Sequence, residues 1–353
     1  MTTVAVAMSG GVDSSVAAAL LLERDFQVIG ITMQHMHDQM LSSNATADAK
    51  KVCKQLNIPH YSFDVKNYFS DTVIDNFIQE YISGRTPNPC VYCNAAIKWG
   101  YLFDKALSLG AGYFATGHYA HIAEDQDTHR MKLQRGIDRT KDQSYALWKL
   151  SQAQLKRTMF PLGGANKTEV REYARLHALE TAMRPESQEI CFIPNNNYRN
   201  FLSEALLKNN QNIQKGKIYD SQGTVLGVHD GYPFYTIGQR KGLGIALGHP
   251  MYVIKIDAER NRIVVGREEE LYASGLKAEN VNWVSVEKLD RGATIEAKIR
   301  YNDPGFSAEI HHVTDTHLQL QFKTPQRAVT PGQSVVVYRN DEVLCGGIIT
   351  EKQ

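Results

Sequence analysis

SGGVDSS, at residues 9–15, connects two segments of opposite character and decides the fold. The apolar segment before it, residues 3–7, is typical of a buried parallel strand, and the alanine- and leucine-rich segment after it, residues 14–24, is typical of a helix. Two glycines let the backbone approach a phosphate closely, and serines at a helix N-terminus lie where free N–H groups and the helix dipole favour an anion. The stretch therefore predicts a nucleotide-binding turn, although glycines with serine caps also form such a turn without a ligand.

Strand-like and helix-like segments alternate through the next hundred residues. Their order is strand, helix, strand, helix, helix, strand: 27–33, 45–56, 60–64, 68–82, 97–109 and 113–115. Strands separated by helices require crossover connections, so this order predicts an α/β domain with a doubly wound parallel sheet. We assign residues 1–200 to this domain, with a hairpin at 121–135 inserted at the end of the sheet. A further helix is expected to start near Asn166, because Glu169 stands at the spacing of a capping box.

The character of the sequence changes near residue 215. Short segments of period two are separated there by Gly, Asn-Asp and Pro-Gly turns: 251–256, 262–265, 294–300, 318–322 and 334–338. Such a pattern is typical of antiparallel sheets or small barrels. We therefore expect two small β-rich domains after the α/β domain, residues 201–275 and residues 276–353, the last of them a β-barrel.

Length and composition limit the class of protein. The 353 residues exceed what one hydrophobic core usually organises, and 42% hydrophobic with 22% charged residues is typical of a folded protein. No apolar run approaches the ~20 residues of a membrane span, and the N-terminus lacks the features of a signal peptide, so we expect a cytoplasmic protein with no membrane partner. Because the net charge is only +1, a nucleic-acid-binding surface would have to concentrate basic residues on one face.

TPNPCVYCN, at residues 86–94, is the second informative stretch. Its prolines restrict the backbone and predict a rigid loop before a helix that starts near Ala95. A thiol at a helix N-terminus has a lowered pKa, which suits Cys90 and Cys93 to nucleophilic chemistry. Cys191 lies 98 residues beyond Cys93, and spacing alone does not join them.

Other readings of the cysteines and glycines are weaker. A zinc ribbon needs two Cys-x-x-Cys pairs and the chain has one, while a thioredoxin-like redox pair fits poorly with the turn at residues 9–15. Cys53 and Cys345 are expected to be small buried residues. No Walker motif occurs, and Gly242 and Gly244 are interpreted as turn glycines because no strand-to-helix crossover surrounds them.

SGGVDSS resembles the PP-loop of ATP pyrophosphatases, which release pyrophosphate from ATP while they adenylate an oxygen of the substrate. Over its whole length the chain is similar to the family of bacterial tRNA-specific 2-thiouridylases. The motifs that carry this resemblance follow in order: SGGVDSS, TPNPCVYCN, ATGHYA (115–120), KDQSY (141–145), ICFI (190–193), YTIGQRKGLG (235–244) and KIRY (298–301). The resemblance implies a PP-loop fold of the adenine nucleotide alpha hydrolase-like class. It also implies adenylation of the C2 oxygen of the wobble uridine (position 34) in tRNA Lys, Glu and Gln, followed by sulfur transfer.

The resemblance implies roles for individual residues. Cys93 would be the nucleophile and Cys191 the persulfide carrier, and the two would end each turnover as a disulfide. Cys90 would contact the target base; some members have Asp at this position, so an acid–base role of that Asp does not carry over. The ATP-binding residues would be Ala7, Met8, Ser9, Gly10, Gly11, Val12, Asp13, Ser14, Met33 and Gly117. The residues that contact the tRNA or its base would be Asn88, Pro89, Cys90, His118, Lys141, Asp142, Gln143, Arg300, Tyr301 and Gln333.

Partners and alternatives complete the expectations. We expect ATP and Mg²⁺ as cofactors, with Asp13 as a candidate for positioning magnesium or phosphate or for capping the helix. The partners would be the anticodon loop of tRNA and a sulfur donor such as a cysteine desulfurase or a sulfur-relay protein. A first alternative is an iron–sulfur-dependent thiolase that holds a [4Fe–4S] cluster on Cys90, Cys93 and Cys191. Two others are a PP-loop synthetase acting on a small molecule and a regulator that senses ATP without chemistry.

Overall fold

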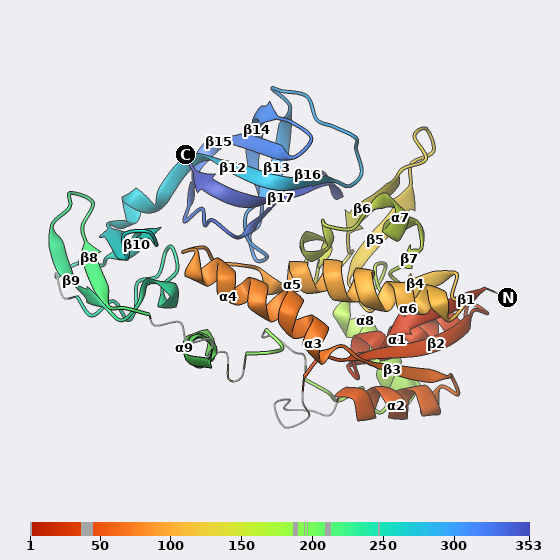
Figure 1. Cartoon of the computed structure of the whole chain (residues 1–353). Helices are drawn as coiled ribbons and strands as arrows, with labels where there is room; N and C mark the ends of the chain where they lie inside the picture. Colours follow the sequence, from red (N-terminus) through yellow and green to blue (C-terminus); the bar gives the residue numbers. More distant parts are fainter. Residues whose placement is uncertain are drawn as a thin grey trace.

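The computed structural model describes residues 2–36, 45–185, 190–193, 195, 197–208, 213–245 and 248–353. Its first part is built on a parallel sheet with the strand order β3-β2-β1-β4-β7 (Figure 1). The strands are β1 (Thr3–Ala7), β2 (Gln27–Gln34), β3 (His60–Asp64), β4 (Tyr113–Ala115) and β7 (Thr158–Met159). Every neighbouring pair in this sheet is parallel, as the alternation of strands and helices predicts.

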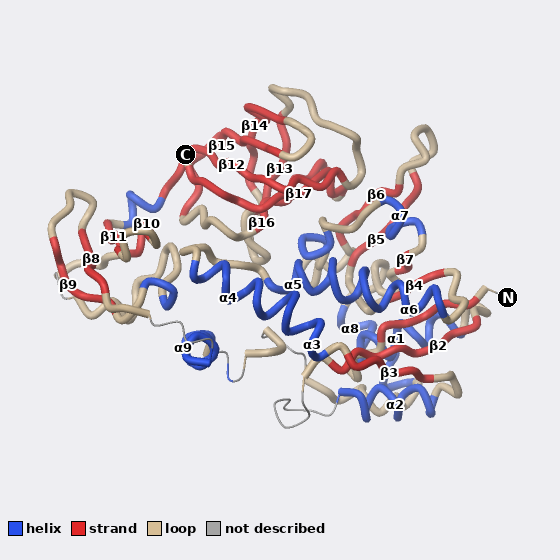
Figure 2. Tube along the Cα trace, in the orientation of Figure 1, coloured by secondary structure: helices blue, strands red, loops and turns tan. Residues whose placement is uncertain are grey.

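Helices cover both faces of this sheet (Figure 2). Val4 and Val6 of β1 pack in one cluster with residues of α1 (Val12–Leu22) and α2 (Ala45–Gln55). The intervening Ala5 belongs to a different cluster, on the side of the helical run formed by α5 (Pro89–Tyr92), η3 (Cys93–Leu102) and α6 (Phe103–Ser108). Because alternate side chains of a strand point to opposite faces, this division confirms the predicted doubly wound α/β fold.

The helical run that carries Cys90 and Cys93 begins earlier than predicted. It starts at Pro89, not near Ala95. The Asn88 Oδ1 atom accepts a hydrogen bond of 3.2 Å from the Cys90 backbone N–H and caps the helix. Proline at the first helical position is favourable because its missing N–H would have no partner there. The predicted loop is present at residues 85–88, but the predicted helix start near Ala95 is wrong, because Pro89 already begins the helix.

The remaining helices frame the sheet and lead toward the β-rich part. They are α3 (Lys66–Phe69), η2 (Ser70–Ile74), α4 (Asp75–Ile82), η4 (Ser144–Leu147), α7 (Gln152–Lys156), α8 (Lys167–Leu176) and α9 (Tyr198–Lys208). The predicted capping box at the start of α8 is present. Asn166 Oδ1 accepts from the Glu169 N–H at 3.0 Å, and the Glu169 carboxylate accepts from the Asn166 N–H at 2.8 Å.

Two β-rich units follow, as predicted. The central one is a four-stranded sheet of β8 (Gly216–Tyr219), β9 (Val225–His229), β10 (Tyr252–Asp257) and β11 (Arg262–Gly266), flanked by η6 (Tyr232–Phe234) and η7 (Glu268–Leu271). The last one is a closed barrel, because β12 pairs with both β15 and β17. Its strands are β12 (Tyr272–Trp283), β13 (Thr294–Lys298), β14 (Phe306–Val313), β15 (His317–Arg327), β16 (Ser334–Arg339) and β17 (Glu342–Lys352).

The predicted hairpin exists but belongs to a different sheet from the one expected. It consists of β5 (Ala120–Glu124) and β6 (Met131–Arg135), and β6 pairs antiparallel with β17 through Leu133 and Val343. Leu133 is fully buried, and the Arg135 N–H donates to the Asp341 carbonyl at 2.8 Å. The hairpin therefore extends the C-terminal sheet, because its apolar partners come from the barrel and not from the parallel strands.

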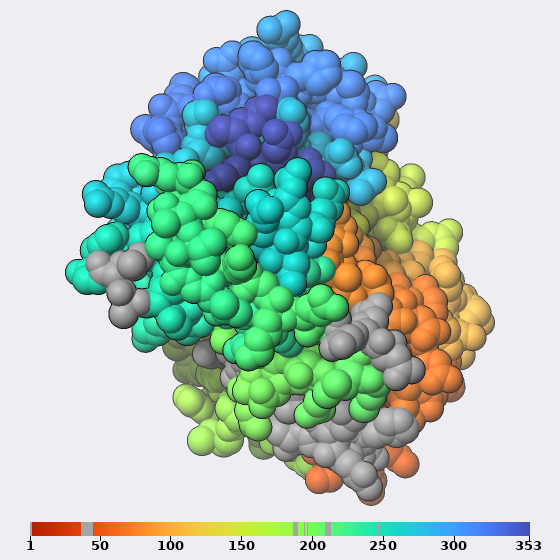
Figure 3. Space-filling model, turned by 60° about the vertical axis from the view of Figure 1, so that its left-hand side comes forward, coloured from red at the N-terminus to blue at the C-terminus, as the bar shows by residue number. Residues whose placement is uncertain are grey.

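The barrel lies over α4 and α5 in Figure 1, and the central β-rich unit lies beside the barrel in Figure 3. Ser334 of the barrel makes two of the hydrogen bonds that join the barrel to the first part. The Trp148 Nε1–H donates to the Ser334 hydroxyl at 2.9 Å, and the Tyr145 hydroxyl donates to the Ser334 carbonyl at 2.8 Å. Within the described ranges, no helix combines the length and apolar character that a bilayer span requires.

Candidate active site

The PP-loop-like turn connects β1 to α1 and is held by its own hydroxyls. Gly11 is the N-cap residue of α1, and its carbonyl accepts hydrogen bonds from the hydroxyls of Ser14 and Ser15 at 3.1 and 2.9 Å. Gly10 has a φ of +72°, and a Cβ there would lie 2.7 Å from the Ala45 carbonyl oxygen. Because the serine hydroxyls are engaged within the turn, the groups it offers a phosphate are chiefly the backbone N–H groups at the start of α1.

The Asp13 carboxylate, a predicted candidate for positioning magnesium or phosphate, is already engaged by protein groups. Its carboxylate accepts hydrogen bonds from the Lys167 ammonium at 2.6 and 2.8 Å and from the Tyr119 hydroxyl at 2.8 Å. Lys167 itself is buried, so this ion pair is a fixed part of the structure beside the turn. A carboxylate that is already paired does not fit the role of a magnesium ligand; it joins α1 to the start of α8 instead.

The other predicted nucleotide residues lie at the same edge of the sheet. Ala7 ends β1, Met33 lies next to last in β2, and Gly117 follows β4. The carboxyl ends of parallel strands meet at one edge, where ligands of open α/β sheets bind. At Gly117 a Cβ would lie 2.7 Å from the Asp13 carbonyl carbon and 2.8 Å from the Ser14 nitrogen, so this glycine lets the loop after β4 touch the turn.

Sequence reasoning missed Arg184, which contacts the same turn. Its guanidinium donates to the Gly10 carbonyl at 3.1 Å and forms an ion pair with Asp48 of α2. Arg184 precedes the segment that carries Cys191 by seven positions. It therefore ties the chain at residue 184 to the turn and to α2, and no motif or spacing marks it.

The structure brings the distant cysteines together. Cys93 lies in one apolar cluster with Phe192 and Ile193, the two residues that follow Cys191. The Phe192 ring is fully buried, with its centroid 5.3 Å from that of Phe77 and 5.8 Å from that of Phe69. This aromatic packing places Cys191 at the border of the cluster that contains Cys93. Residues 186–189, directly before the ICFI motif, lie outside the described residues.

The thiols differ from the expected low-pKa pair. Burial raises the pKa of Cys93 to about 11, while the charges of Lys98 and Cys90 act in opposite directions on it. Cys191 is exposed, yet the surrounding protein limits hydration of a thiolate there, and with the charges of Cys93 and Cys90 it raises the pKa to about 12. The pKa of the exposed Cys90 is also raised, mainly by desolvation. Desolvation thus outweighs the helix N-terminus, and the predicted lowering is wrong. All five cysteines are free thiols, and Cys53 and Cys345 are buried as expected.

Lys98 is a cation of this site that sequence reasoning missed. It lies on η3, a π-helix, five positions after Cys93. Because a π-helix forms i→i+5 hydrogen bonds, residue 98 lies one turn above residue 93, whereas an α-helix would place it about 140° away. The charge of Lys98 counteracts the effect of burial on the pKa of all three site thiols.

His118 connects the thiols to the nucleotide edge. It follows Gly117, and its Nε2 atom lies 3.4 Å from the Lys98 Nζ atom. Its Nδ1 atom lies 2.7 Å from the Thr116 hydroxyl oxygen. Complete burial, with a further contribution from the charge of Lys98, lowers the pKa of His118 well below its usual value. A neutral, buried imidazole is poorly suited to the surface tRNA contact that the resemblance implied, and it fits a place inside the site.

The other residues implied for tRNA contact differ in how exposed their side chains are. Tyr301 and Arg300 are exposed, and Lys141 and Gln143 are half-buried. Asp142 is buried, and its carboxylate accepts hydrogen bonds from the backbone N–H groups of Gly136 and Ser144 and from the Ser144 hydroxyl. The exposed members can meet a polyanion, whereas Asp142 shapes the loop that holds them.

Gln333 and the base-contact residues meet at one loop. The Gln333 side-chain amide donates to the Thr86 and Pro87 carbonyls at 2.8 and 3.1 Å. Pro89 is buried, and Asn88 is used as the helix cap described above. The barrel therefore holds the loop that leads into the cysteine helix through Gln333.

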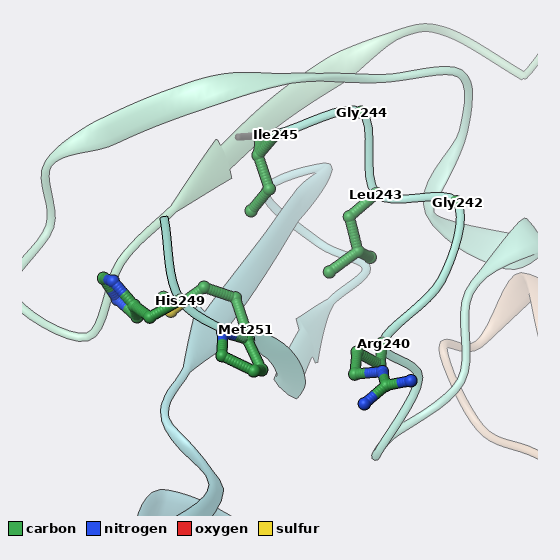
Figure 4. A pocket seen from close by; sticks show the side chains of 8 residues that line it. Arg240, Gly242, Leu243, Gly244, Ile245, His249 and Met251 are labelled. Carbon is green, nitrogen blue, oxygen red and sulfur yellow. The ribbon is translucent and has the colours of Figure 1, made fainter. Parts of the chain in front are cut away.

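The structure bears on two further sequence-based hypotheses: a metal cluster on the three thiols, and the role of Gly242 and Gly244. Among the described residues, no group of three or more His, Cys, Asp or Glu side chains could hold a metal ion, so the geometry does not favour a cluster on the three thiols. Gly242 and Gly244 have φ values of +73° and +68°, as turn glycines do, and line a small pocket of the central unit with Arg240 and His249 (Figure 4). This pocket contains no thiol and is not the nucleotide edge.

Comparison with known proteins covers nearly the whole chain. Three family models match in succession: "tRNA methyl transferase HUP domain" over residues 2–195, "tRNA methyl transferase PRC-barrel domain" over 203–267 and "Aminomethyltransferase beta-barrel domain" over 273–349. The chain is 49% identical over 356 residues to a tRNA-specific 2-thiouridylase of Heliobacterium modesticaldum, covering 98% of this chain and 92% of that protein. It is 47% identical over 359 residues to the protein of the same name from Carboxydothermus hydrogenoformans, covering 99% and 98%.

Solved structures match more remotely. A 4-thiouridine synthetase in complex with RNA and ATP has 17% sequence identity and a TM-score of 0.38, and the match covers 59% of this chain and 51% of that one. A similarity at this level carries no argument about the site.

Proposed function

Because this chain belongs to the family of tRNA-specific 2-thiouridylases, we propose that it replaces the C2 oxygen of the wobble uridine of tRNA with sulfur in an ATP-dependent reaction. One observation carries the proposal: a short series of neighbouring residues links the nucleotide turn to the thiols. Gly117 packs on the start of α1, its neighbour His118 meets Lys98, and Lys98 lies one helical turn from Cys93. Activation of an oxygen and delivery of sulfur can therefore take place side by side.

The first step activates an oxygen that would otherwise be a poor leaving group. The uridine C2 oxygen attacks the α-phosphorus of ATP, the bond to the β-phosphate breaks, and pyrophosphate leaves with the electron pair. The backbone N–H groups at the start of α1 would hold the phosphates. Since Lys167 and Tyr119 engage the Asp13 carboxylate, that side chain has no part in holding magnesium in this scheme.

The second step delivers sulfur. The terminal sulfur of a persulfide on Cys191 attacks C2, the C2–oxygen bond breaks, and AMP leaves. Cys93 then loses its proton and attacks the Cys191 Sγ atom; the sulfur–sulfur bond to the base breaks, and its electron pair remains on the new thiocarbonyl sulfur. The products are 2-thiouridine and a Cys93–Cys191 disulfide, which an external dithiol must reduce before the next turnover. The exposure of Cys191 supports its loading by a separate donor protein.

The substrate side of the proposal rests on exposed residues. The wobble base stands in a single-stranded loop, so it can be turned out into a pocket and read at its edge. Arg300 and Tyr301 on the barrel supply a cation and an aromatic face for the anticodon loop. We further propose that the selected tRNAs are those for Lys, Glu and Gln, and that a cysteine desulfurase or a sulfur-relay protein loads Cys191.

Pyrophosphate release with and without unmodified tRNA, combined with mass analysis of the wobble nucleoside, tests the proposal. The expected result is pyrophosphate release that depends on tRNA and a wobble uridine that gains sulfur. Cys93→Ser and Cys191→Ser should each abolish thiolation while ATP binding remains. Cys53→Ala changes a cysteine outside the site and should retain thiolation. A Cys191→Ser enzyme with full activity on a persulfide donor would eliminate the scheme. Release without tRNA would favour a small-molecule synthetase, and no release would favour an ATP sensor.

A further inference from the structure

The Lys98 ammonium occupies an unusual electrostatic position. The side chain is half-buried, and within the described part of the chain it forms no ion pair with a carboxylate. An ammonium that loses part of its hydration is normally compensated by an acidic partner, because desolvation of an unpaired charge is costly. The absence of such a partner indicates that the compensating anion is supplied during the reaction.

The groups around Lys98 come from several elements. Cys90 and Cys93 precede it on its own helical run, and His118 comes from the loop after β4. His35 comes from the end of β2, and Cys191 comes from the segment held by Phe192. Its charge shifts the pKa of two imidazoles and three thiols: His35, His118, Cys90, Cys93 and Cys191.

The hydrogen bond between Lys98 and His118 defines the tautomer of His118. An ammonium can only donate, so its hydrogen bond to Nε2 assigns the lone pair to Nε2 and the proton to Nδ1, which then donates to the Thr116 hydroxyl. His118 is thus a neutral acceptor with a fixed tautomer. It keeps the ammonium directed into the site without neutralising it.

His35 lies at the border of the same site and also feels the charge of Lys98. Its ring nitrogens are buried; burial lowers the pKa of His35, a hydrogen bond with the Met33 backbone raises it, and the charge of Lys98 lowers it further. Its ring centroid lies 4.9 Å from that of Phe69, and Phe69 packs on Phe192, next to Cys191.

We propose that the Lys98 ammonium binds the anionic sulfur of the reaction, namely the thiolate of Cys93 and the terminal sulfur of a persulfide on Cys191. Lys98 keeps its proton throughout and forms no covalent bond; it stabilises negative charge where desolvation would otherwise suppress it. His118 is a positioning residue that acts through Lys98. The inference rests on the proposed function for the identity of the persulfide, but the effect on Cys93 does not depend on any substrate.

Alkylation of the thiols tests the inference without tRNA. The wild type and Lys98→Met are treated with iodoacetamide near neutral pH, and the modified peptides are quantified by mass spectrometry. Because only the thiolate reacts, removal of one nearby positive charge should slow alkylation of Cys93 by roughly tenfold, which corresponds to about one pKa unit. Lys98→Arg keeps the charge and should restore most of the rate.

Lys105 on the same helical run is the matched control. It too is half-buried, but its ammonium lies 5.3 Å from the Tyr101 ring centroid, and it contributes no shift to the site thiols. Cys93 of the Lys105→Met variant should therefore be alkylated at the same rate as Cys93 of the wild type. If Lys98→Met is unstable by thermal melting, Lys98→Gln carries the same test, since its amide still donates to His118 without a charge.

The reaction itself gives a second readout. In a single turnover with persulfide-loaded enzyme, Lys98→Gln should slow formation of 2-thiouridine by about tenfold and leave tRNA-dependent pyrophosphate release unchanged. Equal alkylation of Cys93 in wild type and both uncharged variants would overturn the inference while wild-type thiolation stands. A wild type that does not thiolate tRNA would refute the proposed function instead, and the alkylation series would still decide the role of Lys98.

Discussion

Replacement of Gly117 by alanine should weaken nucleotide binding as well as lower the stability of the fold. The new Cβ would lie 2.7 Å from the Asp13 carbonyl carbon and 2.8 Å from the Ser14 nitrogen. Both neighbours are backbone atoms, so neither can rotate away as a side chain would. An ordinary contact needs about 3.4 Å, so the loop after β4 and the start of α1 must move apart by about 0.7 Å.

The size of the effect follows from this displacement. Inserting one methyl group into a tightly packed place usually costs 1–3 kcal/mol, so we expect a stability loss of about that amount. The N–H groups that would hold the phosphates belong to the part of α1 that must move, so the substitution should also weaken phosphate binding. A loss of about 1.4 kcal/mol in binding free energy corresponds to a tenfold weaker affinity. We therefore expect the affinity for ATP to fall by roughly tenfold or more.

The assay compares Gly117→Ala with Gly164→Ala. Gly164 faces open space, and neither glycine has a positive φ, so both substitutions add a methyl group without backbone strain. Isothermal titration calorimetry with a non-hydrolysable ATP analogue gives the affinity, and urea unfolding gives the stability. If the two variants bound the analogue with equal affinity, the close contact between the two loops would not support the nucleotide site and the reasoning would fail.

Two further predictions concern the thiol loop. Gln333→Ala removes the two side-chain hydrogen bonds from Gln333 to the loop before the cysteine helix and leaves the backbone hydrogen bond from Thr86 to Pro331. Thiolation should therefore slow at saturating tRNA while ATP affinity is kept. Steady-state kinetics that showed only a raised KM for tRNA would make Gln333 a simple tRNA contact. The pKa of Cys93 is raised to about 11, so its thiolate fraction grows about tenfold with each pH unit below that value. Its alkylation rate should therefore rise steadily from neutral pH to about pH 10, and a plateau below pH 9 would contradict the buried position of this thiol.

The parallel sheet and its nucleotide turn could be predicted because their signals are local. The apolar residues of β1, the glycines that follow it and the helix-forming residues of α1 are consecutive in the chain. The spacing of Asn166 and Glu169 likewise predicts a capping box from only four consecutive residues. The start of the cysteine helix also had a local signal, an Asn followed by Pro, which was interpreted as a loop although proline at the first helical position is favourable.

The rest depends on contacts between distant segments. No local pattern distinguishes the π-helical register of η3 from an α-helix, so Lys98 could not be placed above Cys93. The raised thiol pKa values come from burial beneath aromatic residues such as Phe192, which is about one hundred positions away in the chain. Arg184 belongs to no motif, and its contact with Gly10 exists only once α2 and the turn are in place.

The pairing of β6 with β17 also has a consequence for synthesis on the ribosome. Leu133 receives its partner Val343 only after some two hundred more residues have been translated, so the hairpin emerges long before the strand that completes it. Until then its outer edge presents unpaired N–H and C=O groups, a feature that invites pairing with other chains. Shortened proteins that end before β17 would keep this edge open permanently, so the nucleotide-binding half cannot be expressed alone as a well-behaved fragment unless β5 and β6 are removed or capped.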